Sequence, residues 1–449
     1  MILHNDLLGA LILISSFVIL IIIAELLTKL AKISPEISRK FVHFFCGISC
    51  LAFPFLVMKV LTVFFIATLF ALFLFISGKM GKLKSIHGVK RDSFGGELYP
   101  FSVFAIFYIC QDHLWLYFIS ILILTTADAG AAIIGSNYGK IFYKIDEVNQ
   151  KSLEGSTIFF LLTLQVIQLP LLLMTDIPKA TVVLSSLLVA LLLTGVEAIS
   201  SRGTDNILVP VIACYVLLKI TTKPFSEVAF QCISLSLLAT IMFTINHFVK
   251  FYRLRDTIIM LLFFYAVWSL CSIYWALPLF AAYAVYLLSK SVIPNKNNYK
   301  IIHGAVSKSL ITPLLIVFIA NFYSNYNFFY EPFVVAIALT AINSHMNYFC
   351  NQLDLKKFSN KLLIIGLTLL CIVAVFGVTC WTVSSFNITA IAIEIGVVII
   401  FAIIFKVYLG KPNGLPLNMR QAHMVWILSF IASAIISMLE FANIFNVWR

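Results

Sequence analysis

The sequence has few charged residues. Only 11% of its 449 residues are Asp, Glu, Lys or Arg, whereas 61% are hydrophobic. A soluble globular protein needs about a quarter of its residues charged to cover its surface. This composition therefore excludes a soluble globule, and the chain is expected to lie in a membrane.

The sequence also lacks the motifs of a nucleic-acid-binding protein. Its net charge of +12 arises from Lys and Arg in short loops between apolar runs, which is typical of the charge that orients membrane proteins. No nucleic-acid partner is expected. Nine cysteines are scattered mostly inside the apolar runs, without a CxxC pair or a Cys/His cluster, and they are interpreted as core thiols.

Long apolar runs dominate what is present. Runs of roughly 18 to 22 residues, about enough to cross a ~30 Å hydrocarbon layer, recur from Leu7 almost to the C-terminus. We count about sixteen of them. The first, Leu7 to Leu27, is too long for the core of a signal peptide and lacks a basic segment before it. The sequence predicts an all-α, polytopic transmembrane bundle of about 16 spans, the first one retained.

Basic residues gather in alternate loops, which the positive-inside rule places in the cytosol. The loops then divide the chain near Phe225. Before it they combine Gly, Glu, Asp and Ser with Lys and Arg, and after it they contain mostly Lys, Asn and Arg. We expect a catalytic membrane domain over residues 1–225 and a further multi-span domain of unknown role over residues 226–449.

Two segments of the first half bring charge to the start of an apolar run. Arg39, Lys40 and His43 have the spacing of one helical face, although a basic membrane anchor would look similar. Glu97 follows two glycines at the start of another run. A carboxylate drawn toward lipid needs a partner or a metal, but Glu97 could also pair with a nearby Lys or Arg.

A third segment places Asp128 inside an apolar run. Gly135 follows on the same helical face and Gly139 ends the segment, so a smooth strip surrounds a single acid. Such a strip favours close packing against another helix or a nucleotide. Packing does not explain the acid, and an acid within a span indicates a functional site.

The following loop combines cations with a helix start. Lys140 and Lys151 can neutralise phosphate, and Ser152 begins the next helix, whose N-terminus favours anions. Glu154 is unexpected beside an anion unless Mg²⁺ lies between them. The alternative is that Ser152 caps the helix and Glu154 occupies its first turn.

A last segment brings Glu197 and Asp205 to a predicted cytosolic loop, close to Asn206 and Pro210. The segments then all project from one face of the membrane. Their acids and cations together indicate a phosphate and metal site.

These segments resemble the CTP-dependent lipid-alcohol kinases that include phytol kinase and dolichol kinase, distant relatives of the CDP-diacylglycerol synthases. The resemblance covers the chain up to about residue 220. It implies phosphoryl transfer from CTP, or another nucleoside triphosphate, to the hydroxyl of an isoprenoid alcohol at the cytosolic face of the endoplasmic reticulum or of a bacterial inner membrane. The partners are then a membrane lipid alcohol and a nucleotide.

The resemblance also implies roles for the segments. Asp128 is expected to be essential for catalysis, and His43 or Glu197 to orient or deprotonate the alcohol. The remaining expected roles are Mg²⁺ binding by Asp128, Glu154, Glu97 and Asp205, and nucleotide binding by Arg39, Lys40, Gly135, Gly139, Lys140, Lys151 and Ser152.

Two other functions stay open. A phosphatidate cytidylyltransferase would share Asp128 and the Lys151 loop, but it should carry a later run of His and Gly followed by an Asp-Arg pair, which the sequence lacks. A transporter or non-catalytic scaffold is the other alternative. Transporters place charges and helix breaks near the bilayer midplane, whereas these acids gather at predicted cytosolic helix ends.

Overall fold

The computed structural model describes residues 5–30, 35–88, 94–145, 149–249, 253–292, 308–353, 357–382, 388–409 and 419–442. Nearly all of them are helical. Contacts divide the chain into unit 1, Met1–Leu237, and unit 2, Leu238–Arg449. The division falls inside the helix that begins at Phe225, after Leu237, whereas the boundary expected from the sequence is at residue 225. The different tasks of the two halves stay a prediction.

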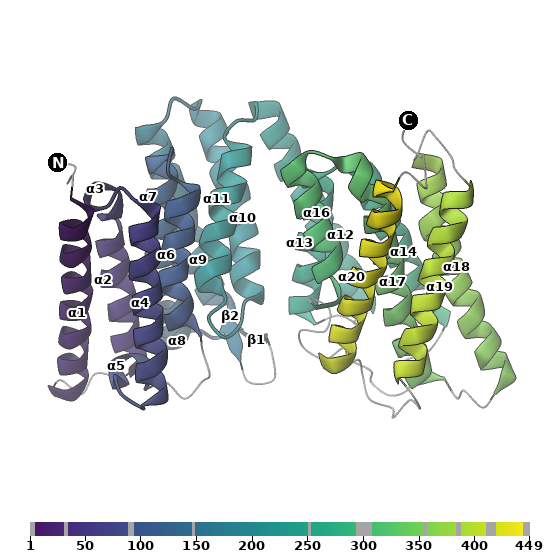
Figure 1. Ribbon diagram of the computed structural model, residues 1–449, viewed down its shortest axis with the longest axis horizontal. Coiled ribbons are helices and arrows are strands. Elements are labelled where there is room, and N and C mark those ends of the chain that lie inside the picture. The colour runs from purple at the N-terminus through teal and green to yellow at the C-terminus, as the bar shows by residue number, and fades with distance from the viewer. Residues whose placement is uncertain are drawn as a thin grey trace. The chain divides into compact units, whose positions relative to one another are not determined.

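Unit 1 is a bundle of long helices joined mostly by short turns (Figure 1). Its helices are α1 (Asp6–Leu30), α2 (Pro35–Cys50), α3 (Phe53–Leu56), α4 (Val60–Lys79), α5 (Lys84–His87), α6 (Gly95–Ile109), α7 (Leu114–Leu122), the π-helix η1 (Ile123–Ala127), α8 (Asp128–Tyr138), α9 (Leu153–Met174), α10 (Lys179–Ile199), α11 (Asp205–Ile220) and the start of α12 (Phe225–Val249).

The helices of unit 1 pack against one another and leave large apolar side chains on the outside. α1 lies against α2, α4 against α6, α9 against both α8 and α10, and α11 against α6. Large apolar side chains point away from these contacts, such as Phe65 on α4 and Leu173 on α9, which are 62% and 75% exposed. Because a helix satisfies its backbone groups internally, such faces can lie in lipid.

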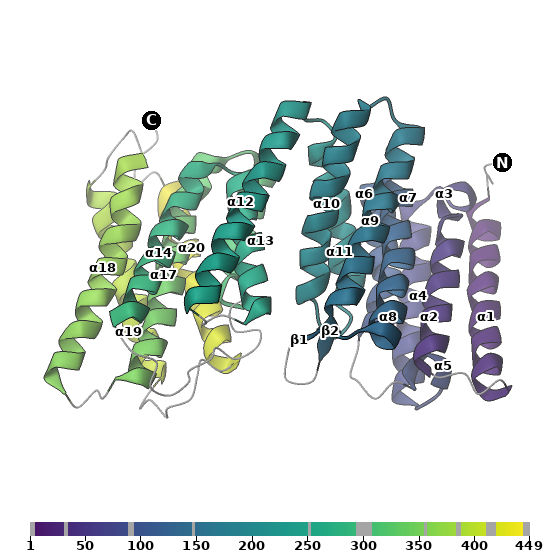
Figure 2. The same cartoon turned by 180° about the vertical axis from the view of Figure 1, so that it is seen from behind.

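The one hairpin among the described residues lies at one end of unit 1. Strands β1 (Phe142–Lys144) and β2 (Gln150–Ser152) pair antiparallel, with Tyr143 opposite Lys151. In both views the hairpin, α5 and α8 lie toward the same end of the unit (Figure 1 and Figure 2). The hairpin therefore brings the Lys151 segment beside the helix that begins at Asp128.

Unit 2 is a second helical bundle. α17 packs against α16, α18, α19 and α20, while α14 packs against α13 and α18. Beyond α12, its helices are α13 (Leu254–Leu270), α14 (Ile273–Val292), α16 (Ile311–Tyr323), α17 (Tyr326–Gln352), α18 (Phe358–Thr382), α19 (Ile388–Leu409) and α20 (Met419–Phe441).

The helices confirm the all-α membrane class. Within the described ranges, nine helical segments are long and apolar enough to cross a membrane, from Asp6–Leu30 to His423–Phe441. The count of about sixteen spans stays a prediction. Several further helices, such as α2 with 16 residues and α6 with 15, are shorter than the ~20 residues that a perpendicular span requires.

Candidate active site

Asp128 is the centre of a polar cluster. Nζ of Lys40 lies 2.5 Å from Oδ2 of Asp128, and Nε2 of His43 lies 3.2 Å from the same oxygen. Lys40 is only 7% exposed. A buried charge is costly unless it is paired, so α2 and α8 hold each other in register through this ion pair.

The surroundings of His43 define where its ring carries a proton. Nε2 also lies 2.7 Å from the carbonyl oxygen of Leu124. Both this carbonyl and the Asp128 carboxylate accept hydrogen bonds, so Nε2 is the donor and Nδ1 carries the lone pair. Nδ1 makes no hydrogen bond to any residue that the structure describes. Nδ1 is therefore the hydrogen-bond acceptor of the His43 ring.

A change of helix type positions Asp128. The π-helix Ile123–Ala127 ends immediately before it, and such segments often occur at functional sites. Gly47 on α2 lies opposite this segment. A Cβ added to Gly47 would be 2.1 Å from Oγ1 of Thr125 and 2.5 Å from the hydroxyl of Tyr99. Glycine is therefore required for this close approach.

Lys151 is the centre of a second polar cluster. Its ammonium donates to a carboxylate oxygen of Glu197 at 2.5 Å and to the Glu197 backbone carbonyl. It also lies 3.6 Å from Oδ2 of Asp205. Glu197 is near the end of α10, Asp205 begins α11, and Lys151 comes from β2. The Lys151 ammonium therefore links three separate elements, β2, α10 and α11.

The two acids beside Lys151 change its ionisation. Burial alone would lower the pKa of Lys151, but Glu197 and Asp205 outweigh that effect and raise it above its ordinary value. Lys151 is therefore positively charged throughout the physiological range. The second carboxylate oxygen of Glu197, Oε2, is buried and has no hydrogen-bond partner within the described part of the chain.

Both clusters line one cavity of about 440 Å³. This polar cavity is within the usual size of small-ligand sites. Four cations in its lining, Arg39, Lys40, Lys151 and Arg202, outnumber three carboxylates. The site residues expected from the sequence that line it are Arg39, Lys40, His43, Asp128, Gly135, Lys151, Ser152, Glu197 and Asp205.

The small residues of α8 make close helix packing possible. A Cβ on Gly135 would lie 2.8 Å from Oγ of Ser152 and 3.4 Å from Cα of Gly155, and a Cβ on Gly139, directly after α8, would lie 2.8 Å from Cβ of Ser152. Ser152 caps α9 by accepting a hydrogen bond from the Gly155 amide. The capping alternative for Ser152 is thus the observed one.

Some expected site residues lie elsewhere. The described lining of the polar cavity leaves out Glu97, Gly139, Lys140 and Glu154. The Glu154 carboxylate turns back to accept a hydrogen bond from the backbone amide of Ile141 at 3.3 Å. We therefore leave Glu154, Lys140 and Gly139 out of the candidate site.

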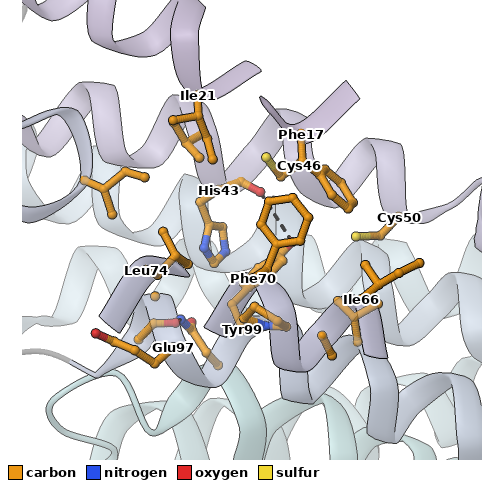
Figure 3. Close-up of a pocket in the computed structure, with 18 of the residues that line it drawn as sticks. Phe17, Ile21, His43, Cys46, Cys50, Ile66, Phe70, Leu74, Glu97 and Tyr99 are labelled. Carbon is orange, nitrogen blue, oxygen red and sulfur yellow. Dashed lines mark hydrogen bonds between the residues drawn. The ribbon is translucent and has the colours of Figure 1, made fainter. Parts of the chain in front are cut away.

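Glu97 lines a second cavity of about 370 Å³, formed mainly by α1, α2, α4 and α6. Most of its wall is apolar, so we name it the apolar cavity. Figure 3 shows His43 and Tyr99 between Glu97 on one side and Phe17 on the other. The hydroxyl of Tyr99 donates to the His43 backbone carbonyl at 3.4 Å. The two cavities share lining residues, among them His43.

The polar cavity fits a metal only as part of a nucleotide complex. The described residues contain no group of three or more His, Cys, Asp or Glu that could hold an ion alone. Mg²⁺ bound with phosphates needs only one or two carboxylates from the protein. Oε2 of Glu197 is unpartnered, and Oδ1 of Asp128 is not used by the Lys40 and His43 contacts. Glu197 and Asp128 thus offer the one or two carboxylates that a phosphate-bound Mg²⁺ needs from the protein.

Sequence reasoning gave no role to one residue at the junction of the cavities. Asn206 lines both of them, and its side-chain nitrogen donates to the Gly95 carbonyl at 2.8 Å. This bond ties the start of α11 to the start of α6. The Asp205-Asn206 pair was the available signal, but the sequence could not show that α6 lies beside it.

Comparisons with known proteins find no similarity that extends this description. No protein family model, no curated protein and no solved structure matches the chain.

Proposed function

We propose that the chain is a lipid-alcohol kinase that transfers a phosphoryl group from CTP, or another nucleoside triphosphate, to the hydroxyl of a membrane isoprenoid alcohol. One observation carries the proposal. A single cavity joins a carboxylate-oriented imidazole, Asp128 with His43, to a second acid and cation cluster around Lys151. Phosphoryl transfer requires this combination of charge neutralisation and positioning.

The nucleotide phosphates would occupy the polar cavity. Lys40 and Lys151 would each exchange part of a carboxylate contact for a phosphate contact, and Arg39 and Arg202 add charge to the same lining. Asp128 and Glu197 would hold the nucleotide's Mg²⁺, which would screen charge on the phosphate oxygens, and Asp205 would remain beside Lys151.

His43 would serve as the general base. The alcohol oxygen attacks the terminal phosphorus as Nδ1 of His43 accepts its proton, and the bond from that phosphorus to the bridging oxygen breaks. The products are a lipid phosphate and a nucleoside diphosphate, and the proton leaves His43 for solvent. Asp128 would hold the ring in the required tautomer and stabilise its protonated form, as a carboxylate does beside a catalytic histidine.

The test uses purified full-length protein in lipid nanodiscs, a panel of prenols and nucleoside triphosphates labelled on the γ-phosphate. The expected result is label in a prenol phosphate that depends on Mg²⁺ and on Asp128. Absence of labelled lipid with every nucleotide, from protein shown to be folded, contradicts the proposal. It would favour the transporter or scaffold alternative.

A further inference from the structure

The apolar cavity has a polar end and an apolar end. Five residues of α2 line it and are spaced as one helical stripe: Arg39, Val42, His43, Cys46 and Cys50. At a rise of 1.5 Å per residue this stripe covers about 16 Å. Charged and polar side chains begin it, and the last two positions are thiols, which behave as small apolar groups when buried.

Aromatic rings close the apolar end. The ring of Phe17 packs against Phe53 with centroids 6.2 Å apart and against the edge of Phe70 at 5.1 Å. Phe17 and Phe53 are 7% and 2% exposed. Figure 3 shows Phe17, Cys50 and Ile66 on the side opposite Glu97, with His43 between them. The rings therefore form a floor that a chain entering from the polar end would meet.

The polar end coincides with the wall that the two cavities share. Arg39, His43 and Asn206 line both. A ligand in the apolar cavity and a ligand in the polar cavity would thus both lie against these side chains. A carboxylate, Glu97, also lines the apolar cavity near this wall and can accept a hydrogen bond from a hydroxyl.

We infer that the apolar cavity binds the tail of a single-chain lipid alcohol, with its hydroxyl at His43 and its tail ending at Phe17, Phe53 and Phe70. The inference rests on the proposed kinase function and adds to it the place where the acceptor's tail binds and a limit on the tail's length. A cavity of about 370 Å³ is near the lower limit for small-ligand sites. A single narrow chain fits that space.

The floor should select acceptor length. Each methylene buried on binding adds about fourfold to affinity, and a chain longer than the cavity gains nothing from its excess carbons. We expect wild-type protein to prefer farnesol or geranylgeraniol to a long dolichol-type polyprenol, measured as kcat/KM.

Two variants should move this preference in opposite directions. Phe70→Ala deepens the cavity and should shift the ratio of kcat/KM values toward the longer prenol by about 16-fold, the effect of roughly two more buried methylenes. Ala67→Leu, which fills the same cavity, should shift the ratio toward farnesol. Phe65→Ala is the matched control, because Phe65 is on the same helix and faces outward with 62% exposed.

A binding readout separates this inference from the kinase proposal. A geranylgeraniol analogue with a photoreactive diazirine at its tail end is cross-linked to the full chain in nanodiscs without nucleotide, and the labelled peptides are identified by mass spectrometry. We expect labels on α1 and α4 near Phe17 and Phe70, reduced by excess geranylgeraniol and not by diacylglycerol.

Each outcome decides one point. Cross-links at α1 and α4 without any phosphorylation support the tail site and contradict the kinase proposal. Phosphorylation with cross-links elsewhere, or with a length preference unchanged in both Phe70→Ala and Ala67→Leu, overturns the tail site while the kinase proposal stands. Equal competition by diacylglycerol overturns the single-chain class.

Discussion

Replacing Asp128 by Asn removes the charge that two other side chains depend on. Lys40 would keep its positive charge in a place where it is 7% exposed, and His43 would lose the carboxylate at its Nε2. The variant should therefore affect stability through Lys40 and catalysis through His43. A second substitution can separate the two effects.

The expected magnitudes follow from burial. Breaking a buried ion pair from one side costs about 3–5 kcal/mol. The Asp128 side chain is 18% exposed, so a value near 3 kcal/mol is expected. Adding Lys40→Met to Asp128→Asn removes the unpaired charge. The two substitutions should therefore show a coupling energy of about 1–3 kcal/mol in the free energy of unfolding. Turnover should fall by at least tenfold, equivalent to about 1.4 kcal/mol, in the single and double variants alike.

The assay combines two measurements on purified protein in one detergent. Thermal unfolding, followed by loss of the folded peak in size-exclusion chromatography, reports stability, and prenol phosphorylation reports turnover. Asp112→Asn is the control, since Asp112 is exposed in the turn between α6 and α7. Asp128→Asn with wild-type stability would contradict the buried ion pair. More than about a tenth of wild-type turnover would contradict the catalytic assignment.

Three further predictions test other parts of the account. Because the pKa of Lys151 is raised, its charge is complete below the ordinary lysine value and lost only as pH rises through the higher one. The affinity of the wild-type protein for nucleotide should therefore stay constant from about pH 7 to pH 9. Lys151→Met should lower that affinity at least tenfold. A binding titration in which wild-type affinity falls between these pH values would refute the charge assigned to Lys151. Glu97→Gln should raise KM for the alcohol without changing the Mg²⁺ dependence, and a changed Mg²⁺ dependence in the same kinetics would make Glu97 a metal ligand instead. In sealed vesicles of protein without native thiols, the exposed positions Arg202 and Asp112 should be labelled from opposite sides of the membrane as Arg202→Cys and Asp112→Cys, with Arg202→Cys on the cytosolic side. Labelling of both from one side refutes the topology.

The all-α membrane class could be predicted because long apolar runs favour membrane-spanning helices. Runs such as Leu7 to Leu27 are within helices of spanning length. The spacing of Arg39, Lys40 and His43 predicts one helical face, and all three line the polar cavity. The lone acid Asp128 within an apolar run is at the centre of the first cluster. A charged side chain within lipid is costly, so an acid within an apolar run of the sequence indicates a functional site.

Other features depend on contacts that no sequence pattern contains. Glu154 and Glu197 look equally suited to a site, but Glu154 bonds a backbone amide of its own loop while Glu197 meets Lys151. The π-helix Ile123–Ala127 has no distinctive composition, and its close contact with Gly47 joins residues far apart in the sequence. The apolar cavity combines single residues of several helices, so it could not be found without their arrangement in space.

The most direct test of the central claim compares two labelled forms of CTP, one labelled on the α-phosphate and the other on the γ-phosphate. Full-length protein receives CTP labelled either on the α-phosphate or on the γ-phosphate, together with geranylgeraniol or phosphatidate. A lipid-alcohol kinase puts the γ-label into geranylgeranyl phosphate and leaves the α-label in CDP. Transfer of the α-label to phosphatidate, with release of the γ-label in pyrophosphate, would contradict the kinase and identify a cytidylyltransferase.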